Sequence, residues 1–508
     1  MALVALAGCG STVALNSAGA GGGGNLGGSS TGSAASATNA GGTGSGSGLS
    51  GTTVAGGGGS GGTGLAPGSP AASSGPSGAP GSSGGGAVGT GPGNNSGDGP
   101  GVTATTINVG VAYDPDASTA DSALGAANAN PGDQKVQQQA VIDYVNTHGG
   151  VAHRKLVPIW YQATVNNSAT TTDSQACAAW TQDTKTFVFT IGGTPIFDQC
   201  TANAHAIADI TGATALETTP TNEKYPADIN LTALSIDRAM RVTVQGLAQQ
   251  GYFSHGAKVG IATWDDPNYH YGIGAAAQPA LAAVGLHNVP VEYIAVPQSY
   301  GDLSATSASV SSAVLKFHQQ GIDHVLLFDG PAGVNSSGIL VIEWTNQAQS
   351  QRYFPRYGLN STSGLSTLAP DLPAQQLAGS LAVGWYPTLD ETTADYPTSK
   401  LPPAGRLCQK IMAAAGQPAS GNNQLSLELA ECDSFFFLQQ VLDPITGPLN
   451  QKTALAAIDA IGSRYTPLST FGVYLSSTRH DGASLVSNAA FVASCTCYRY
   501  TGSPYNPG

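Results

Sequence analysis

From residue 106 onwards, apolar segments at strand spacing alternate with amphipathic segments at helical spacing. This alternation constrains the fold more than any other feature of the sequence. In TINVGVAY, Ile107, Val109 and Val111 alternate with small residues, which is typical of a buried strand. An apolar face predicts a helix over 133–147, which Gly149 ends in a left-handed conformation. Such strand–helix repeats form parallel sheets with helices on both faces, so we predict an α/β fold.

The repeat continues through three more strands. KLVPIWY (155–161) is predicted as the second strand, and Pro158 places it at a sheet edge because proline cannot donate to the ladder. A helix around 172–184 leads to a third strand, TFVFTIGG, and a helix near 200–208 leads to a fourth, GATALE. The second strand is the edge strand in the doubly wound order 2-1-3-4-5, which we therefore predict.

A second series of the same plan follows, which predicts two doubly wound parallel-sheet lobes. Strands are expected at 257–264, 289–296, 323–330 and 377–387, with a short one in RYGLNS, and helices at 273–284, 304–320 and 335–349. Helices at 402–415, 424–442 and 451–462 precede a strand-like closing segment, SNAAFVASCTCYRY.

The first hundred residues have a different composition. They hold 35 of the 69 glycines, no Lys, Arg or Glu, and a single acid, Asp98. Because so few large apolar side chains cannot offset the entropy of ordering the backbone, we expect disorder. Residues 10–104 are predicted to be a flexible Gly/Ser-rich linker, with an end-to-end span of roughly 50–60 Å.

The opening MALVALAGCG contains Leu-Ala-Gly-Cys, which resembles the lipobox of bacterial lipoproteins. The resemblance implies that residues 1–9 are a signal remnant and that Cys9 carries a lipid anchor in the cell membrane. No positively charged stretch precedes the short apolar run, so we expect a few residues upstream of Met1. A chance match ahead of a disordered tail is the alternative. No apolar run of 18 residues follows, so no membrane-spanning helix is predicted.

Six further cysteines agree with an oxidising, extracytoplasmic compartment, because their number is even and no CxxC pair suggests a metal. Proximity in the sequence favours the pairs Cys177–Cys200 and Cys408–Cys432. Cys495 and Cys497 stand two apart on a predicted strand and face the same side, so only a strained bridge is expected there, and free thiols or other pairings remain open.

The charge of the folded part excludes some partners. All 18 basic side chains and all but one of the 31 acidic ones lie after residue 100. An acidic surface without a basic stripe argues against nucleic acid and against direct binding to an anionic membrane surface.

The folded part, about 105–502, resembles the type I periplasmic solute-binding proteins, and within them the branched-chain amino acid and amide group. The resemblance is carried by the helix–turn–strand unit with Asn146, Gly149, Gly150, Arg154 and Lys155, and by IGG at 191–193, Gly251-Tyr252, YGIG at 271–274, GIDHVLLF at 321–328, PRYGL at 355–359 and GWYP at 384–387. It implies two lobes joined by a three-strand hinge, with lobe one at 105–231 plus 387–478 and lobe two at 232–386 plus 479–502.

The function implied is capture of a small polar solute, such as an amino acid or amide, by hinge closure and its delivery to an ABC permease. The protein is expected to act as a monomer without catalysis or cofactor. A ligand-sensing module without transport is the first alternative, and an enzyme on the same scaffold is the second. Neighbouring permease and ATPase genes would favour transport, and a neighbouring kinase gene would favour sensing.

Ligands bind at the carboxyl ends of parallel strands, so the candidate binding residues follow the predicted strands. In lobe one they are Tyr113, Asp114, Asp116, Gly193, Thr194, Thr218 and Thr219; in lobe two they are Trp264, Asp265, Tyr271, Asp329, Asn360 and Trp385. In amino-acid-binding members of the family, an acid after the PRYGL-type strand holds the α-ammonium group. Here Asn360-Ser361 is neutral, which puts a plain amino acid in doubt. Each acid could equally cap a helix or turn.

Other chemistry is not supported by the sequence. G-x-S-x-G occurs only in the linker, for example at 58–62 and 81–85, where no strand–turn–helix is expected. The glycines of Gly272-Ile273-Gly274 mimic a dinucleotide fingerprint but lie about seven residues beyond their strand. The nine histidines show no HxH or HxxxH pair, and Asp265-Asp266 lacks EF-hand spacing, so no metal site is predicted.

Overall fold

The computed structural model describes residues 97–119, 130–164, 167–212, 217–254, 256–330 and 338–508. The lipobox, Cys9, most of the predicted linker, most of GATALE and the start of the 335–349 helix lie outside these residues. Within the described part, no helix is both long enough and apolar enough to cross a membrane.

The first sheet has five parallel strands in the order β2-β1-β3-β4-β5. Its strands are β1 (Thr106–Tyr113), β2 (Lys155–Gln162), β3 (Val188–Phe189), β4 (Ile207–Ile210) and β5 (Asp228–Asn230). The predicted order is confirmed, and Pro158 lies on the edge strand β2, opposite Val109 of β1. Successive side chains of β1 point to opposite faces of the sheet, so Val109 packs in the buried cluster on one face and Ala112 in the cluster on the other.

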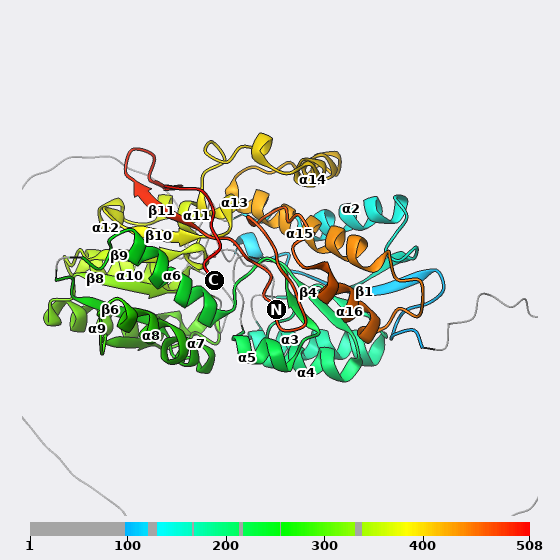
Figure 1. Cartoon of the computed structure of the whole chain (residues 1–508), viewed down its shortest axis with the longest axis horizontal. Helices are drawn as coiled ribbons and strands as arrows, with labels where there is room; N and C mark the ends of the chain where they lie inside the picture. Colours follow the sequence, from blue (N-terminus) through cyan, green and yellow to red (C-terminus); the bar gives the residue numbers. More distant parts are fainter. Residues whose placement is uncertain (1–96, 120–129, 165–166, 213–216, 255, 331–337) are drawn as a thin grey trace, which may run out of the picture. The chain divides into compact units, whose positions relative to one another are not determined.

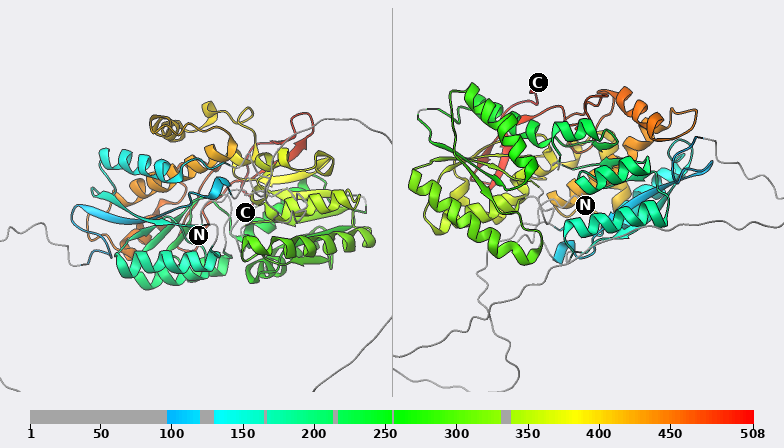
Figure 2. Two further views of the ribbon diagram at one scale, coloured as in Figure 1. Left: turned by 180° about the vertical axis from the view of Figure 1, so that it is seen from behind. Right: turned by 90° about the horizontal axis from the view of Figure 1, so that it is seen from below.

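Helices cover both faces of this sheet, as Figures 1 and 2 show. On one face lie α2 (Gln134–Thr147), α15 (Asn422–Leu442) and α16 (Gln451–Ile461), with α14 (Pro403–Ala414) packed on α2 and α15. On the other lie α3 (Ala169–Ala178) and α4 (Pro195–Ala204). We call this sheet and its helices the first lobe.

The second sheet has seven strands in the order β12-β11-β10-β9-β8-β6-β7. The five parallel strands are β6 (Val259–Trp264), β7 (Val291–Ile294), β8 (His324–Phe328), β9 (Arg356–Asn360) and β10 (Leu381–Gly384). β11 (Ser487–Val492) and β12 (Cys497–Tyr500) add an antiparallel hairpin. The helices of this second lobe include α6 (Ile236–Gln249), α9 (Leu303–Gln320) and α10 (Ile339–Ser350).

The chain passes between the lobes three times, and two of the passages run side by side. After β5, the N–H of Asn230 donates to His480 O at 2.8 Å, and the N–H of Gly482 donates to Asn230 O at 2.7 Å. A Cβ on Gly482 would lie 2.1 Å from Leu231 O, so only glycine allows this approach. Beside the third passage, Thr470 Oγ1 donates to Trp385 O at 2.6 Å. The residue bounds assigned to the two lobes from the sequence stay a prediction.

Two elements of the first lobe were placed wrongly from the sequence. The fourth strand is Ile207–Ile210, not GATALE, because its helix α4 begins at Pro195 and ends before His205, which has a left-handed conformation (φ 55°). The early start has a local cause: Thr194 Oγ1 accepts from Phe197 N, which caps the helix. The three-residue strand β5 was not predicted at all.

The helix predicted at 273–284 begins earlier. The Asp266 side chain accepts from Asn268 N at 2.8 Å and caps α7 (Pro267–Gly272), which continues through a π-helical turn (Ile273–Ala277) into α8 (Gln278–Ala283). Gly272 and Gly274 therefore lie inside a helix rather than in a phosphate-binding turn.

The predicted linker also extends too far. Residues 97–104 pack on the first lobe: Gly99 N donates to Leu449 O at 2.8 Å, and Val102 is buried. Asp98, the single acid of the segment, accepts from Leu449 N at 2.9 Å and lies 3.9 Å from Arg154.

Both predicted disulfides are present in the structure. Cys177–Cys200 joins α3 to α4, and Cys408–Cys432 joins α14 to α15. Cys495 is bonded to Cys497. The expectation that these two share a strand is wrong, because Cys495 lies in the turn of the β11–β12 hairpin and Cys497 is the first residue of β12.

Candidate functional site

In the second lobe, the carboxyl ends of β6, β8, β9 and β10 meet at one edge of the sheet. They bring together four predicted site residues, all of them buried: Trp264, Asp329, Asn360 and Trp385. The Trp264 indole donates to Gly330 O at 3.0 Å, which ties the end of β6 to the end of β8.

Asp329 is satisfied by the protein itself. Its two carboxylate oxygens accept from Gly330 N at 2.7 Å and from Val341 N, in the first turn of α10, at 3.1 Å. Burial raises the pKa of Asp329 to about 7, against the lowering effect of these N–H groups. Because the Asp329 carboxylate already caps α10 through these backbone N–H groups, Asp329 does not present a free negative charge to a solute.

Asn360 and Ser361 occupy the place where amino-acid-binding members of the resembled family would have an acid. Asn360 accepts from Thr362 N at 2.9 Å and donates to Thr243 Oγ1 at 3.0 Å. Ser361 Oγ donates to Asp390 Oδ2 at 2.7 Å. Both side chains bond within the lobe, so neither holds an ammonium group in this arrangement.

A small cavity of about 20 Å³ lies at this edge. Asp329, Gly330, Asn360 and Thr362 give it a polar side, and its remaining wall consists of Leu234, Ile236, Ala239, Met240, Tyr269 and Phe328. The volume is enough for about one water molecule. The wall is therefore apolar and aromatic, with hydroxyl, amide and backbone groups at one end.

Four predicted residues of the second lobe do not line this cavity: Trp264 and Trp385, which are buried beside it, and Asp265 and Tyr271. The Asp265 carboxylate is 61% exposed and lies 2.7 Å from His270 Nε2. The Tyr271 side chain, on α7, is exposed.

In the first lobe, the predicted residues are held by local hydrogen bonds. Asp114 accepts from Asp116 N at 2.9 Å, and burial raises its pKa to about 6. Tyr113 donates to Gln162 on the edge strand at 3.0 Å.

The three predicted threonines lie at the starts of two helices. Thr194 caps α4 and donates to Asp173 Oδ2 at 2.9 Å, next to Gly193 in a left-handed conformation. Thr218 is the N-cap residue of α5 (Thr219–Lys224), and Thr219 Oγ1 donates to Asp237 Oδ2 at 2.8 Å. These contacts are those of the structural alternative, turn and helix capping.

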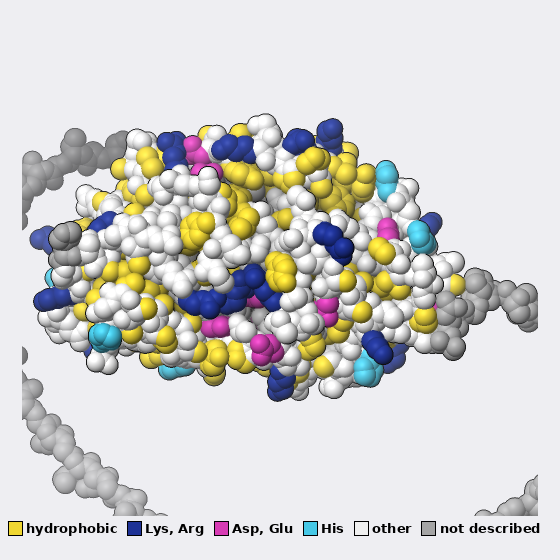
Figure 3. Space-filling view, in the orientation of Figure 1, with side chains coloured by type: hydrophobic (Ala, Val, Ile, Leu, Met, Phe, Trp, Pro, Cys, Tyr) yellow, Lys and Arg dark blue, Asp and Glu magenta, His cyan; other side chains and the backbone are white. Residues whose placement is uncertain are grey.

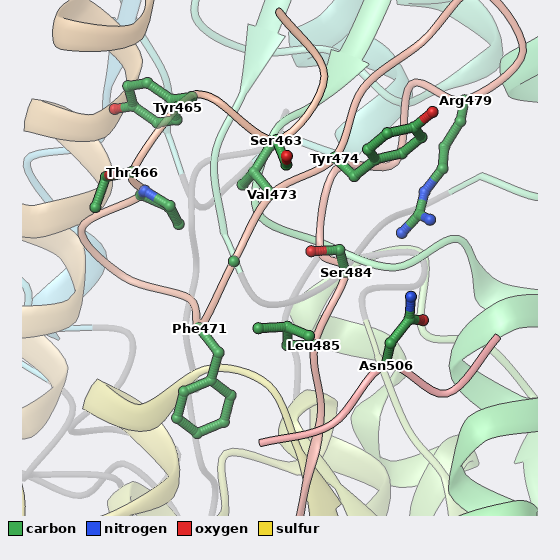
Figure 4. A pocket seen from close by; sticks show the side chains of 12 residues that line it. Ser463, Tyr465, Thr466, Phe471, Val473, Tyr474, Arg479, Ser484, Leu485 and Asn506 are labelled. Carbon is green, nitrogen blue, oxygen red and sulfur yellow. The ribbon is translucent and has the colours of Figure 1, made fainter. Parts of the chain in front are cut away.

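A larger cavity of about 520 Å³ was missed by the sequence reasoning. It is lined by residues between Ser463 and Leu485 together with Asn506, and Figure 4 shows Tyr474 and Arg479 side by side at one end. The Arg479 guanidinium lies 5.5 Å from the Tyr474 ring and donates to Ala483 O. Its lining comes from segments that pass between the lobes, whereas ligands of doubly wound sheets bind at the strand ends.

Basic side chains gather on the face drawn in Figure 3, near the point where Figure 1 marks the C-terminus. There Arg241 donates to Gly508 O at 3.2 Å, and Arg238 pairs with Asp481. Burial, and then the charge of Arg238, lowers the pKa of Arg479 to about 10. Arg238, on α6, donates to Asp481 O and Ala483 O and so ties this helix to the third passage, whereas the bond of Arg479 to Ala483 O lies within that passage.

Solved structures share this architecture. A possible leucine/isoleucine/valine-binding protein from Rhodopirellula baltica has a TM-score of 0.54 at 14% identity, over 78% of this chain and 97% of that one. The chain has the type I periplasmic binding protein fold. A solute-binding protein of an ABC transporter from Rhodopseudomonas palustris in complex with p-hydroxybenzoic acid gives 0.54 at 14% identity, over 79% and 97%.

A third structure with the type I fold is the fatty acid ABC transporter substrate-binding protein from Thermomonospora curvata, with a TM-score of 0.54 at 15% identity, over 80% and 94%. The sequence itself matches no protein-family model and no curated protein. Since these neighbours differ in the solutes that their names give, the type I fold alone does not assign a ligand.

Proposed function

We propose that the protein is an extracytoplasmic solute-binding protein that encloses a small molecule between its lobes and delivers it to an ABC permease. The observation that carries the proposal is that parallel strands of the second lobe end at one edge of the sheet, where the ends of β8 and β9 line a cavity with an apolar and aromatic wall. In doubly wound sheets, ligands bind at such ends, and closure of two lobes then excludes water. Two disulfides in the first lobe support an oxidising compartment.

The same wall leads us to propose a solute that is apolar or aromatic where it meets the second lobe. Asp329 is satisfied by backbone N–H groups, and Asn360 by its own lobe, so neither of these two side chains is free to hold an ammonium group. Met240, Phe328 and Tyr269 offer contact to a ring or an alkyl chain. The binding residues of the first lobe remain those predicted from the sequence.

Native mass spectrometry of the gently purified full chain tests the proposal, followed by thermal unfolding with amino acids, amides, aromatic carboxylates and fatty acids. A retained small molecule, or one class that raises the Tm, is the expected result. A chain that carries no small molecule and gains no stability from any class would contradict solute binding.

The chain offers a matched pair of variants. Met240 lines the cavity at the strand ends, and Met412 is equally buried in the first-lobe core. Met240→Ala and Met412→Ala should each cost about 2–5 kcal/mol of stability, because both leave a cavity. Only Met240→Ala should change the Kd or the choice of solute. Equal effects on binding would place the site elsewhere.

Delivery and anchoring need separate tests, because a sensing module would bind the solute in the same way. Stimulation of the permease ATPase by the loaded chain, and not by the empty one, would support transport. We further propose that Cys9 is lipidated, and mass spectrometry of the membrane-extracted protein and of Cys9→Ser tests this.

A further inference from the structure

Three acidic side chains meet inside the first lobe, away from the strand-end site of the second lobe. Asp198 lies in the first turn of α4, Glu217 directly precedes the N-cap of α5, and Asp228 begins β5. One carboxylate oxygen from each of the three lies within 4.8 Å of those from the other two. The residues are 2%, 1% and 0% exposed, so water does not screen them.

Several of these oxygens meet no hydrogen-bond donor. They are Oδ1 of Asp198, Oε1 of Glu217 and both oxygens of Asp228. The hydroxyl of Thr201 lies close enough to lower the pKa of Asp228, but it donates to Phe197 O at 2.8 Å instead. A buried carboxylate without a donor costs several kcal/mol of stability, so three that face one another require a compensating positive charge or bound protons.

No basic side chain of the described part forms an ion pair with the cluster. Lys224 of α5 is near enough to feel the charge of Asp198, but it lies fully in solvent. Among the described residues, Asn230 Nδ2 donates to Glu217 Oε2 at 2.8 Å, and the backbone N–H of Gly193 lies close enough to lower the pKa of Asp228. Helix α4 accounts for an acid in its own first turn, but it does not account for the other two.

We propose that Asp198, Glu217 and Asp228 form a binding site for a divalent cation, and that the cation is Ca²⁺. The donors are all oxygens, which hard cations prefer. Two ligands of one Ca²⁺ ion, each about 2.4 Å from it, lie no more than about 4.8 Å apart, and the oxygens of this cluster stay within that limit. Mg²⁺ usually keeps several waters and takes one or two carboxylates, which a fully buried site with three acids fits less well.

The site would join parts of the lobe that are distant in sequence. It links α4 to β5 and to the residue before Thr218, which is one of the candidate binding residues. Asn230, bonded to Glu217, also bonds through its backbone to His480 and Gly482 of the returning chain. A bound cation therefore fixes the end of β5 where the chain leaves the first lobe. This inference does not rest on the solute-binding proposal.

Calorimetric titration of the EDTA-treated full chain with CaCl₂ at pH 7.5 tests the site. One Ca²⁺ per chain and a higher Tm in CaCl₂ than in EDTA are expected. MgCl₂ and MnCl₂ serve as parallel titrations. The absence of both binding heat and a Tm shift with all three cations would overturn the site, and tighter binding of Mg²⁺ than of Ca²⁺ would overturn the assignment to Ca²⁺.

Variants connect the binding to these residues. Asp228→Asn and Glu217→Gln remove one charge each and should weaken the Kd for Ca²⁺ at least about tenfold, since ligand charge sets affinity. Asp433→Asn is the matched control: Asp433 is equally buried, but it accepts from Tyr465, Leu468 and Ser469. It should keep the Ca²⁺ response even if it is less stable. Unchanged Ca²⁺ binding in both Asp228→Asn and Glu217→Gln would refute the assignment.

Discussion

Removal of the Cys408–Cys432 disulfide should lower the free energy of unfolding more than removal of the Cys495–Cys497 disulfide. The bridge joins α14 to α15, both cysteines are fully buried, and they are 24 residues apart in the sequence. In the chain-entropy model, a closed loop of that length restricts the unfolded chain by about 11–12 cal/mol/K, or about 3.4 kcal/mol at 25 °C. The cavity left by two alanines adds to this cost.

The hairpin bridge provides the control. Cys495 and Cys497 are two residues apart, so the same model gives only about 1 kcal/mol for their link. Urea unfolding of the full chain, followed by tryptophan fluorescence, should show a clearly larger loss of unfolding free energy for Cys408→Ala/Cys432→Ala than for Cys495→Ala/Cys497→Ala. Equal losses would refute the loop-entropy reasoning, and alkylation of Cys408 in the native protein would refute the bridge itself.

Two further predictions concern packing and pH. Gly110→Ala should destabilise the first lobe by about 1–3 kcal/mol, because its Cβ would lie 2.5 Å from the fully buried Trp180 ring. Gly274 lies in a helical turn with open space around the Cβ, so Gly274→Ala should instead raise the free energy of unfolding by about 0.5–1 kcal/mol in the same urea titration. Burial raises the pKa of Asp329 and of Asp390 to about 7, against about 4 in the unfolded chain. Between pH 4 and 7 the folded protein therefore binds more protons than the unfolded chain, and it loses stability as the pH rises through that range. The Tm in EDTA should be higher at pH 5 than at pH 8, with a smaller difference in Asp390→Asn; a Tm that rises with pH would contradict this.

Local sequence patterns predicted much of the fold, because side-chain alternation and the missing N–H of proline depend only on neighbouring residues of the chain. The alternation in β1 and the proline in β2 were enough to place β2 at the edge of a doubly wound sheet, next to β1. Helix starts were predicted less well. Thr194-Pro195 and Asp266-Pro267 are both N-cap–proline pairs, and attention to them would have placed α4 and α7 correctly. The short strand β5 has no such signal, because three residues cannot show a period.

The sequence indicated which side chains lie at the strand ends, but not what they bond to. Strand ends can be read from the sequence, so Asp329 and Asn360 were expected at one edge, and the structure places them together. Their hydrogen bonds depend on α10 and α6, which the sequence could not place relative to the strands. The acids at 198, 217 and 228 were not grouped at all, because their proximity comes from the tertiary fold and not from motif spacing.

The buried acids of the first lobe fall into two kinds, and the difference links pH to the proposed cation. Asp433 meets donors at both oxygens, so burial alone raises its pKa, to about 6. Burial and the neighbouring acids together raise the pKa of Glu217 and of Asp228 well above the usual range, and no basic side chain of the described part pairs with them, so bound protons are the alternative to a cation. Ca²⁺ and protons must then compete for the same oxygens. The stabilisation by Ca²⁺ should therefore grow from pH 5 to pH 8, over the range in which the stability of the Ca²⁺-free protein falls.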